Sequence, residues 1–125
     1  MQSQEIDKVS ITILIDKYTD ILLPNTSHAL RSPMIKKERF LRAPLAEHGF
    51  SVLLKVYYKI KKDNNDNKNE IEEYENCSNT FLFDAGVSEE GIITNAGNFS
   101  VNLDEIEAII LSHGHLDHFT GILKF

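Results

Sequence analysis

Hydrophobic and polar residues alternate in several parts of the chain, and each of these parts predicts a β-strand. Residues 9–15 (VSITILI) place Ser10 and Thr12 between β-branched apolar residues, as in a half-buried strand. Residues 51–60 (SVLLKVYYKI) and 80–83 (TFLF) have the same character. The apolar run at 108–111 predicts a fourth strand, which we expect to be buried.

The segments between these strands differ in composition. Residues 24–49 have no clear periodicity of apolar residues and contain all three prolines of the chain. We therefore interpret them as a long ordered loop with one or two helical turns near residues 34–41. Residues 61–78 form a polar insertion rich in Asn, Lys and acids. This insertion is either a solvated hairpin tip or a disordered segment.

Helix signals are concentrated after the third strand. Ser88 is a suitable cap for a short helix, with Glu89 and Glu90 in its first turn. We expect a loop at 95–98, a helical turn at 103–107, and a last helix that begins near Phe119. The length of 125 residues fits one domain, 1–125.

Composition and targeting signals narrow the class of protein. Hydrophobic residues make up 42% of the chain, which is enough for a packed core. Cys77 is the one cysteine, so no disulfide forms within the chain, and this fits a reducing cytoplasm. There is no secretory signal and no apolar run of bilayer length. We therefore predict a soluble cytoplasmic protein without a membrane partner.

Charge is unevenly distributed. The net charge is −6, which argues against a nucleic-acid-binding protein. Residues 1–62 hold eleven basic and six acidic residues, whereas residues 63–125 hold two basic and thirteen acidic residues. An anionic partner would favour the first half, and a metal cation the second.

The segment Ser112-His113-Gly114-His115-Leu116-Asp117-His118 carries the strongest chemical signal. Imidazole nitrogens and carboxylate oxygens bind zinc and similar divalent ions. Two histidines one residue apart in a tight turn can face one ion, and the following Asp and His can face a second. The segment therefore predicts a divalent metal site that is held by His113, His115, Asp117 and His118.

The wider segment AIILSHGHLDHFTGI resembles the signature of the metallo-β-lactamase fold superfamily. TFLFDAG, upstream, resembles that superfamily's strand that ends in Asp and Gly. The segment AEHGFS at 46–51 is similar to a subgroup that includes the synthase joining a dihydropterin to ribofuranosylaminobenzene phosphate in methanopterin synthesis. The resemblance covers residues 9–125.

This resemblance implies an α/β fold, with one sheet and short flanking helices as the N-terminal half of a four-layer αβ/βα sandwich. It implies that His113 and His115 hold a first metal ion, and that Asp117 and His118 hold a second. Asp117 would also position the reacting water, which makes it the candidate catalytic residue. Asp84 would brace the ligand loop from behind. Zinc is the expected metal, and iron and manganese also suit these ligands.

The resemblance also implies that the later part of the superfamily's domain, with its remaining metal ligands, is absent from this sequence. The superfamily's remaining ligands follow the histidine motif, and only seven residues follow His118 here. We therefore expect a truncated hydrolase or transferase, or one half of a split protein that a second chain completes. The alternatives are a non-catalytic fragment and, less favoured by the acidic charge, a nucleic-acid-processing relative.

Two further features bear on the substrate. The loop at 24–49 contains five basic residues that could hold an anionic small molecule: Arg31, Lys36, Lys37, Arg39 and Arg42. The alternative is a solvated charged surface. His48 either faces the active site or has a structural role in the loop.

Overall fold

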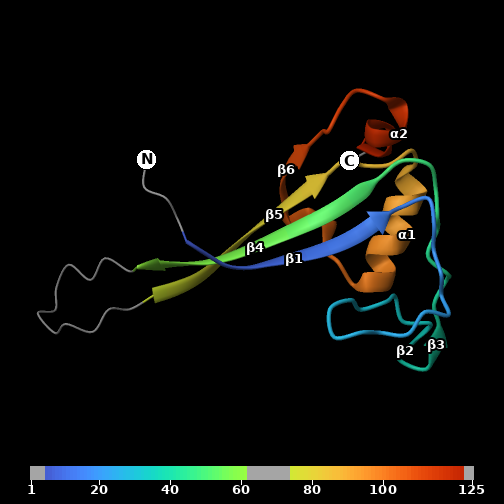
Figure 1. Ribbon diagram of the computed structural model, residues 1–125, viewed down its shortest axis with the longest axis horizontal. Coiled ribbons are helices and arrows are strands. Elements are labelled where there is room, and N and C mark those ends of the chain that lie inside the picture. Colours follow the sequence, from blue (N-terminus) through green and yellow to red (C-terminus); the bar gives the residue numbers. More distant parts are fainter. Residues whose placement is uncertain (1–4, 62–73, 123–125) are drawn as a thin grey trace, which may run out of the picture.

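The computed structural model describes residues 5–61 and 74–122. Its centre is a four-stranded sheet with the strand order β1-β4-β5-β6. The strands are β1 (Ile6–Ile15), β4 (Ser51–Lys61), β5 (Tyr74–Phe83) and β6 (Ile106–Ile110). Figure 1 shows β1, β4 and β5 as long strands, with helix α1 (Glu89–Phe99) at one end of the sheet. The predicted α/β class, mostly one sheet with short helices, is confirmed.

Antiparallel pairing joins the first three strands, and parallel pairing adds the fourth. Ile11 of β1 lies opposite Leu54 of β4, and Leu54 lies opposite Phe81 of β5. The chain then passes through α1 and the 3₁₀ turn η1 (Leu103–Glu105) before β6 pairs in parallel with β5. Two strands that follow one another in the chain can pair in parallel only if such a crossover returns the chain to the starting end of the sheet. It brings the carboxyl ends of β5 and β6 to the same edge of the sheet.

One face of the sheet forms the hydrophobic core with α1. Leu14, Leu53 and Leu82 from three neighbouring strands pack with Ile92 and Ala96 of α1. Ser88 caps α1 as predicted, because its hydroxyl accepts a hydrogen bond from the Gly91 amide at 3.0 Å. This packing fixes the helix against the strand ends that carry the candidate site.

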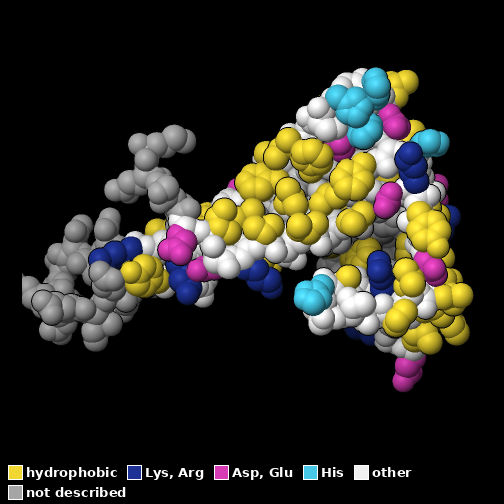
Figure 2. Space-filling view, viewed as in Figure 1, with side chains coloured by type: hydrophobic (Ala, Val, Ile, Leu, Met, Phe, Trp, Pro, Cys, Tyr) yellow, Lys and Arg dark blue, Asp and Glu magenta, His cyan; other side chains and the backbone are white. Residues whose placement is uncertain are grey.

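The opposite face of the sheet is largely uncovered. Val9, Ile11 and Ile13, alternate residues of β1, are 47%, 64% and 51% exposed. Figure 2 shows a continuous band of hydrophobic side chains over the strands. The strand predicted at 108–111 is present as β6, but its predicted burial is wrong, because β6 is an edge strand and Ile110 is 44% exposed.

The loop at 24–49 runs along α1 and is attached to it at several points. The Asn95 amide donates to the carbonyls of Leu14 and Leu45, and it accepts from the Leu45 amide. Asn98 donates to the Arg42 carbonyl at 2.9 Å. The predicted loop at 95–98 is therefore wrong, since these asparagines belong to the helix and point into the contact with the loop.

Other predicted elements differ from the observed ones in type, in length or in where they begin. Residues 34–41 form a hairpin of β2 (Ile35–Lys36) and β3 (Arg39–Phe40) instead of helical turns. β5 begins at Tyr74, so it includes residues 74–78 of the predicted insertion, whose residues 62–73 lie outside the described part. The last helical segment starts earlier, with α2 (Leu116–Phe119) followed by η2 (Thr120–Ile122). The helical turn at 103–107 is the shorter η1. None of the described helices is long and apolar enough to cross a membrane.

Candidate metal centre

The predicted ligands lie in residues 112–118, called here the histidine loop, which comprise the turn after β6 and the first three residues of α2. This loop and residues 84–86 follow the carboxyl ends of β6 and β5, the neighbouring parallel strands. The two segments are directly connected, because the Ala85 amide donates to the His118 carbonyl at 2.7 Å. Figure 2 shows that histidine side chains cluster at this end of the molecule.

Asp84 lies behind the histidine loop, as the sequence predicted. Its carboxylate accepts hydrogen bonds from the Ser112 amide at 2.7 Å, the Ser112 hydroxyl at 2.6 Å and His118 Nδ1 at 2.8 Å. The side chain is 1% exposed. Its backbone is left-handed, with φ of 53°, a conformation that Asp adopts more readily than most residues. The carboxylate thus connects the start and the end of the loop.

The surroundings of Asp84 favour its charged form. Burial raises the pKa of this carboxyl, but the hydrogen bonds from the Ser112 side chain and backbone and from His118 together outweigh it. The pKa of Asp84 therefore lies below its ordinary value of 3.8. At neutral pH the group is a carboxylate that accepts three hydrogen bonds and donates none.

The imidazoles of His113 and His115 face one another through nitrogen atoms. His113 Nε2 and His115 Nδ1 are 3.0 Å apart, and the ring centroids are separated by 4.4 Å. Two nitrogens that bind one tetrahedral zinc at about 2.0–2.1 Å each lie about 3.3 Å apart. The two nitrogens therefore match the separation of two ligands of one zinc ion once the rings move apart by a few tenths of an ångström.

His118 and Asp117 form a second group beside this pair. The ring of His118 lies 4.1 Å from that of His113, measured between centroids. His118 Nδ1 is occupied by Asp84, so its Nε2 is the nitrogen open to a ligand, and it lies 3.7 Å from Asp117 Oδ2. A carboxylate behind a histidine is the usual arrangement at metal sites, where it orients the ring and raises its basicity.

The donor set is incomplete within residues 5–61 and 74–122. There, no group of three or more His, Cys, Asp or Glu side chains is arranged to hold a metal ion. A catalytic zinc usually takes three protein ligands and leaves one position open. The residues present thus fit a metal as ligand pairs that need at least one further donor.

Gly49, which was not among the predicted site residues, packs against the site. Gly49 has φ of 98°, and a β-carbon built there would lie 1.8 Å from the Asp117 carbonyl oxygen. It is part of the AEHGFS segment, which was the signal that could have identified it. His48 beside it is exposed. Glu47 accepts a hydrogen bond from the Ser88 hydroxyl at the start of α1.

The five basic residues do not form one cluster with the histidine loop. Arg42 pairs with Glu90 in the first turn of α1 at 2.9 Å, whereas Lys36 donates to Ser100 at the other end of that helix. An eleven-residue helix is about 16 Å long. Lys37 occupies the left-handed turn of the small hairpin and Arg39 lies in β3, while Arg31 precedes the hairpin. Arg42 is thus the one of these five with a contact at the N-terminal end of α1.

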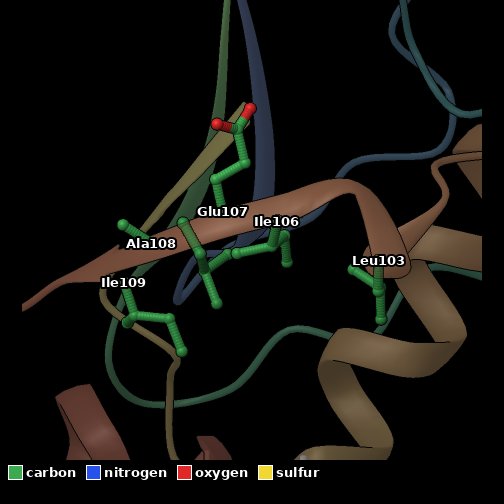
Figure 3. A pocket seen from close by; sticks show the side chains of 6 residues that line it. Leu103, Ile106, Glu107, Ala108 and Ile109 are labelled. Atoms are coloured by element: carbon green, nitrogen blue, oxygen red, sulfur yellow. The ribbon is translucent and has the colours of Figure 1, made fainter. Parts of the chain in front are cut away.

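An apolar hollow of about 350 Å³ lies beside β6 and away from the histidine loop. It is lined by Leu82, Leu103, Ile106, Glu107, Ala108 and Ile109. Figure 3 shows that Glu107 points to the opposite side of the strand from Ile109. The Glu107 carboxylate accepts hydrogen bonds from Asn79 and from the Thr80 amide. The lining of the hollow is therefore apolar apart from Glu107, whose carboxylate is engaged in these hydrogen bonds.

Comparison with known families gives a match over the C-terminal part of the chain. The family model described as the metallo-beta-lactamase superfamily matches residues 73–125, a region that contains β5, Asp84 and the whole histidine loop. Members of that superfamily typically bind divalent metal ions. No curated protein matched the chain in a sequence search.

Proposed function

We propose that this chain is the metal-binding half of a metallo-β-lactamase-type enzyme that acts on an anionic small molecule. The observation that carries the proposal is the convergence of His113 Nε2 and His115 Nδ1, 3.0 Å apart, in a loop that Asp84 braces. The family match over residues 73–125 supports the same interpretation.

Each residue of the loop has its own part in this proposal. His113 and His115 hold one ion, and Asp117 with His118 holds a second. Zinc, iron and manganese all accept such ligands. When bound, such ions supply Lewis-acid chemistry at an ester, amide or phosphate group. Asp117 is the residue that orients the reacting water, because its side chain is 38% exposed and is the loop's only carboxylate.

A second chain is proposed to complete the domain. The exposed face of the sheet carries apolar side chains at alternate positions of β1, which is the pattern of a sheet that packs against another layer. The described ligand set also lacks a third donor for either ion. One partner layer that brings further His and carboxylate ligands would satisfy both requirements.

The substrate class is proposed from the charge of the long loop and from the AEHGFS segment. The Arg42 backbone lies beside Asn98 near the C-terminal end of α1, but its guanidinium reaches Glu90 in the first turn, the end of the helix that follows the turn at 84–86. A phosphorylated pterin-type molecule would present an anion to such a side chain while its reacting group lies at the metals. The reaction is then a transfer or a hydrolysis.

Activity of the purified chain is the first test. With added zinc and a chromogenic phosphodiester or ester, we expect turnover well below about one per second, a low value for an enzyme. Turnover at ordinary enzyme rates by the chain alone would contradict the need for a partner. An Asp117→Ala variant with the same residual rate as the wild type would contradict the role of Asp117.

A non-catalytic fragment is the second candidate, and the incomplete ligand set favours it. The coding sequence that follows Phe125 distinguishes the two candidates. An in-frame continuation, or an adjacent gene, that encodes further His and Asp ligands supports an enzyme half. A metal-free purified chain that takes up no zinc supports the fragment.

A further inference from the structure

The Ser112 hydroxyl lies at the centre of the hydrogen bonds behind the histidine loop. Its Oγ is 2.6 Å from Asp84 Oδ2 and 2.8 Å from His113 Nδ1. It is also 3.5 Å from His118 Nδ1, at the outer limit of a hydrogen bond. Ser112 thus lies between the buried carboxylate and the first histidine of the metal pair.

The number of available hydrogens fixes the direction of each bond. The Asp84 carboxylate already accepts from the Ser112 amide, and its Oδ2 lies only 2.6 Å from Ser112 Oγ. Because a carboxylate oxygen has no hydrogen to give, the single hydroxyl hydrogen of Ser112 goes to Asp84 Oδ2. The Ser112 oxygen then has only lone pairs left for its contact with His113 Nδ1. His113 Nδ1 must therefore carry a hydrogen and donate it.

We propose that Ser112 is a positioning residue, which transmits the constraint of Asp84 to His113 and holds that ring as the Nδ1–H tautomer with Nε2 free for a metal. The inference rests on the proposed metal-binding function and extends it to a residue outside the ligand set. Asp84 then orients two ligands by two routes. It contacts His118 directly at 2.8 Å and reaches His113 through Ser112.

The same argument extends to the other ring of the pair. A neutral His113 with its hydrogen on Nδ1 has only a lone pair on Nε2. The contact of 3.0 Å to His115 Nδ1 therefore requires His115 to donate in the metal-free protein. To hold a metal together with His113 Nε2, His115 would need its hydrogen on Nε2, whereas the His113 tautomer would stay the same.

The test uses variants that remove the Ser112 oxygen and retain the other contacts. Ser112→Ala keeps the backbone bond from the Ser112 amide to Asp84 Oδ1 and the bond from His118 to Asp84. Ser112→Thr restores the hydroxyl. Ser78→Ala, at an exposed serine in β5, is the matched control. Ser112→Cys replaces the alanine variant if that variant does not fold.

Imidazole ¹⁵N chemical shifts of the metal-free full chain report the tautomer directly. The spectra are recorded at about pH 8. In the wild type, the Ser112→Thr variant and the Ser78→Ala control, His113 should show a protonated Nδ1 and an unprotonated Nε2. In Ser112→Ala, the Nε2–H form of His113 should appear. An unchanged His113 tautomer in Ser112→Ala would overturn the proposal.

Zinc binding measured by competition with a chelator provides the second readout. Loss of a group that orients a ligand typically lowers metal affinity about 10–100-fold, so we expect at least about a tenfold loss in Ser112→Ala and recovery in Ser112→Thr. Equal affinities, or no recovery with threonine, would overturn the positioning role. If the wild-type chain binds no zinc, the proposed function fails, while the ¹⁵N shifts still decide whether Ser112 fixes His113.

Discussion

Gly49 lies directly against the backbone of Asp117, although 68 positions separate them in the chain. The α-carbon of Gly49 is so close that any β-carbon would overlap the Asp117 carbonyl. Its φ of 98° is in addition a value that L side chains rarely adopt. The AEHGFS segment is therefore a support for the histidine loop, at a point where only glycine fits.

A Gly49→Ala substitution should displace the histidine loop. The overlap and the backbone strain together should destabilise the chain by about 2–4 kcal/mol, and zinc affinity should fall with the displacement of Asp117. Gly97→Ala is the matched control, since an added β-carbon on this residue of α1 meets nothing within 4 Å. Alanine there should be neutral or stabilising by up to about 1 kcal/mol. Urea denaturation of both variants measures the difference, and similar midpoints would contradict the contact.

Acid sensitivity should depend on Asp84. Its pKa is lower in the folded chain than the ordinary value of 3.8, so the unfolded state binds more protons between these two values. The stabilisation by Asp84 is therefore present above about pH 3.8 and is lost as the pH falls through the native pKa.

Asp84→Asn is the variant that checks this dependence. Asn tolerates the left-handed backbone but places an amide group opposite the donors of Ser112 and His118. We expect a loss of about 1–3 kcal/mol at pH 7, with a gap to the wild type that narrows below pH 3.8. Equal slopes of unfolding free energy against pH in the acid range would argue against a depressed Asp84 pKa.

Local sequence rules predicted the features that local physics determines. The alternation at 9–15 and the cap at Ser88 do not depend on distant residues, and the structure has both. The contact of Asp84 with the histidine loop followed from its place at the end of a strand. The spacing of the histidines predicted a metal site at residues 113–118, and metal binding there stays a prediction.

Tertiary contacts account for the errors. Asn95 has a low helix preference, but the helix retains it because its amide makes three hydrogen bonds to the strand and the loop. Polar residues 74–78 extend β5 because they pair with β4. The predicted burial of β6 is wrong because an apolar run does not specify which segment will cover it.

Anion binding by the long loop should depend on Arg42 and Arg39. The Arg42–Glu90 pair is about two-thirds exposed on both sides, so it is weak and can exchange for a ligand. The double variant Arg39→Ala, Arg42→Ala should bind inorganic phosphate several-fold more weakly than the wild type at low salt. The difference should fade as salt screens the charges. The matched double lysine variant keeps both charges and should retain part of the affinity. Phosphate affinities are measured by calorimetry at low salt. Identical affinities of the wild type and the alanine double variant would mean that these two residues are only part of the solvated surface.

The central claim is that His113 and His115 hold a divalent metal. The direct measurement is the zinc content per chain after equilibrium dialysis of three proteins: the wild type, a His113→Ala, His115→Ala double variant, and a His28→Ala control. His28 is exposed and contacts Ser27 instead of the histidine loop. We predict that the wild type and the control bind zinc equally and that the double variant loses most of it. Equal zinc content in all three proteins would contradict the account.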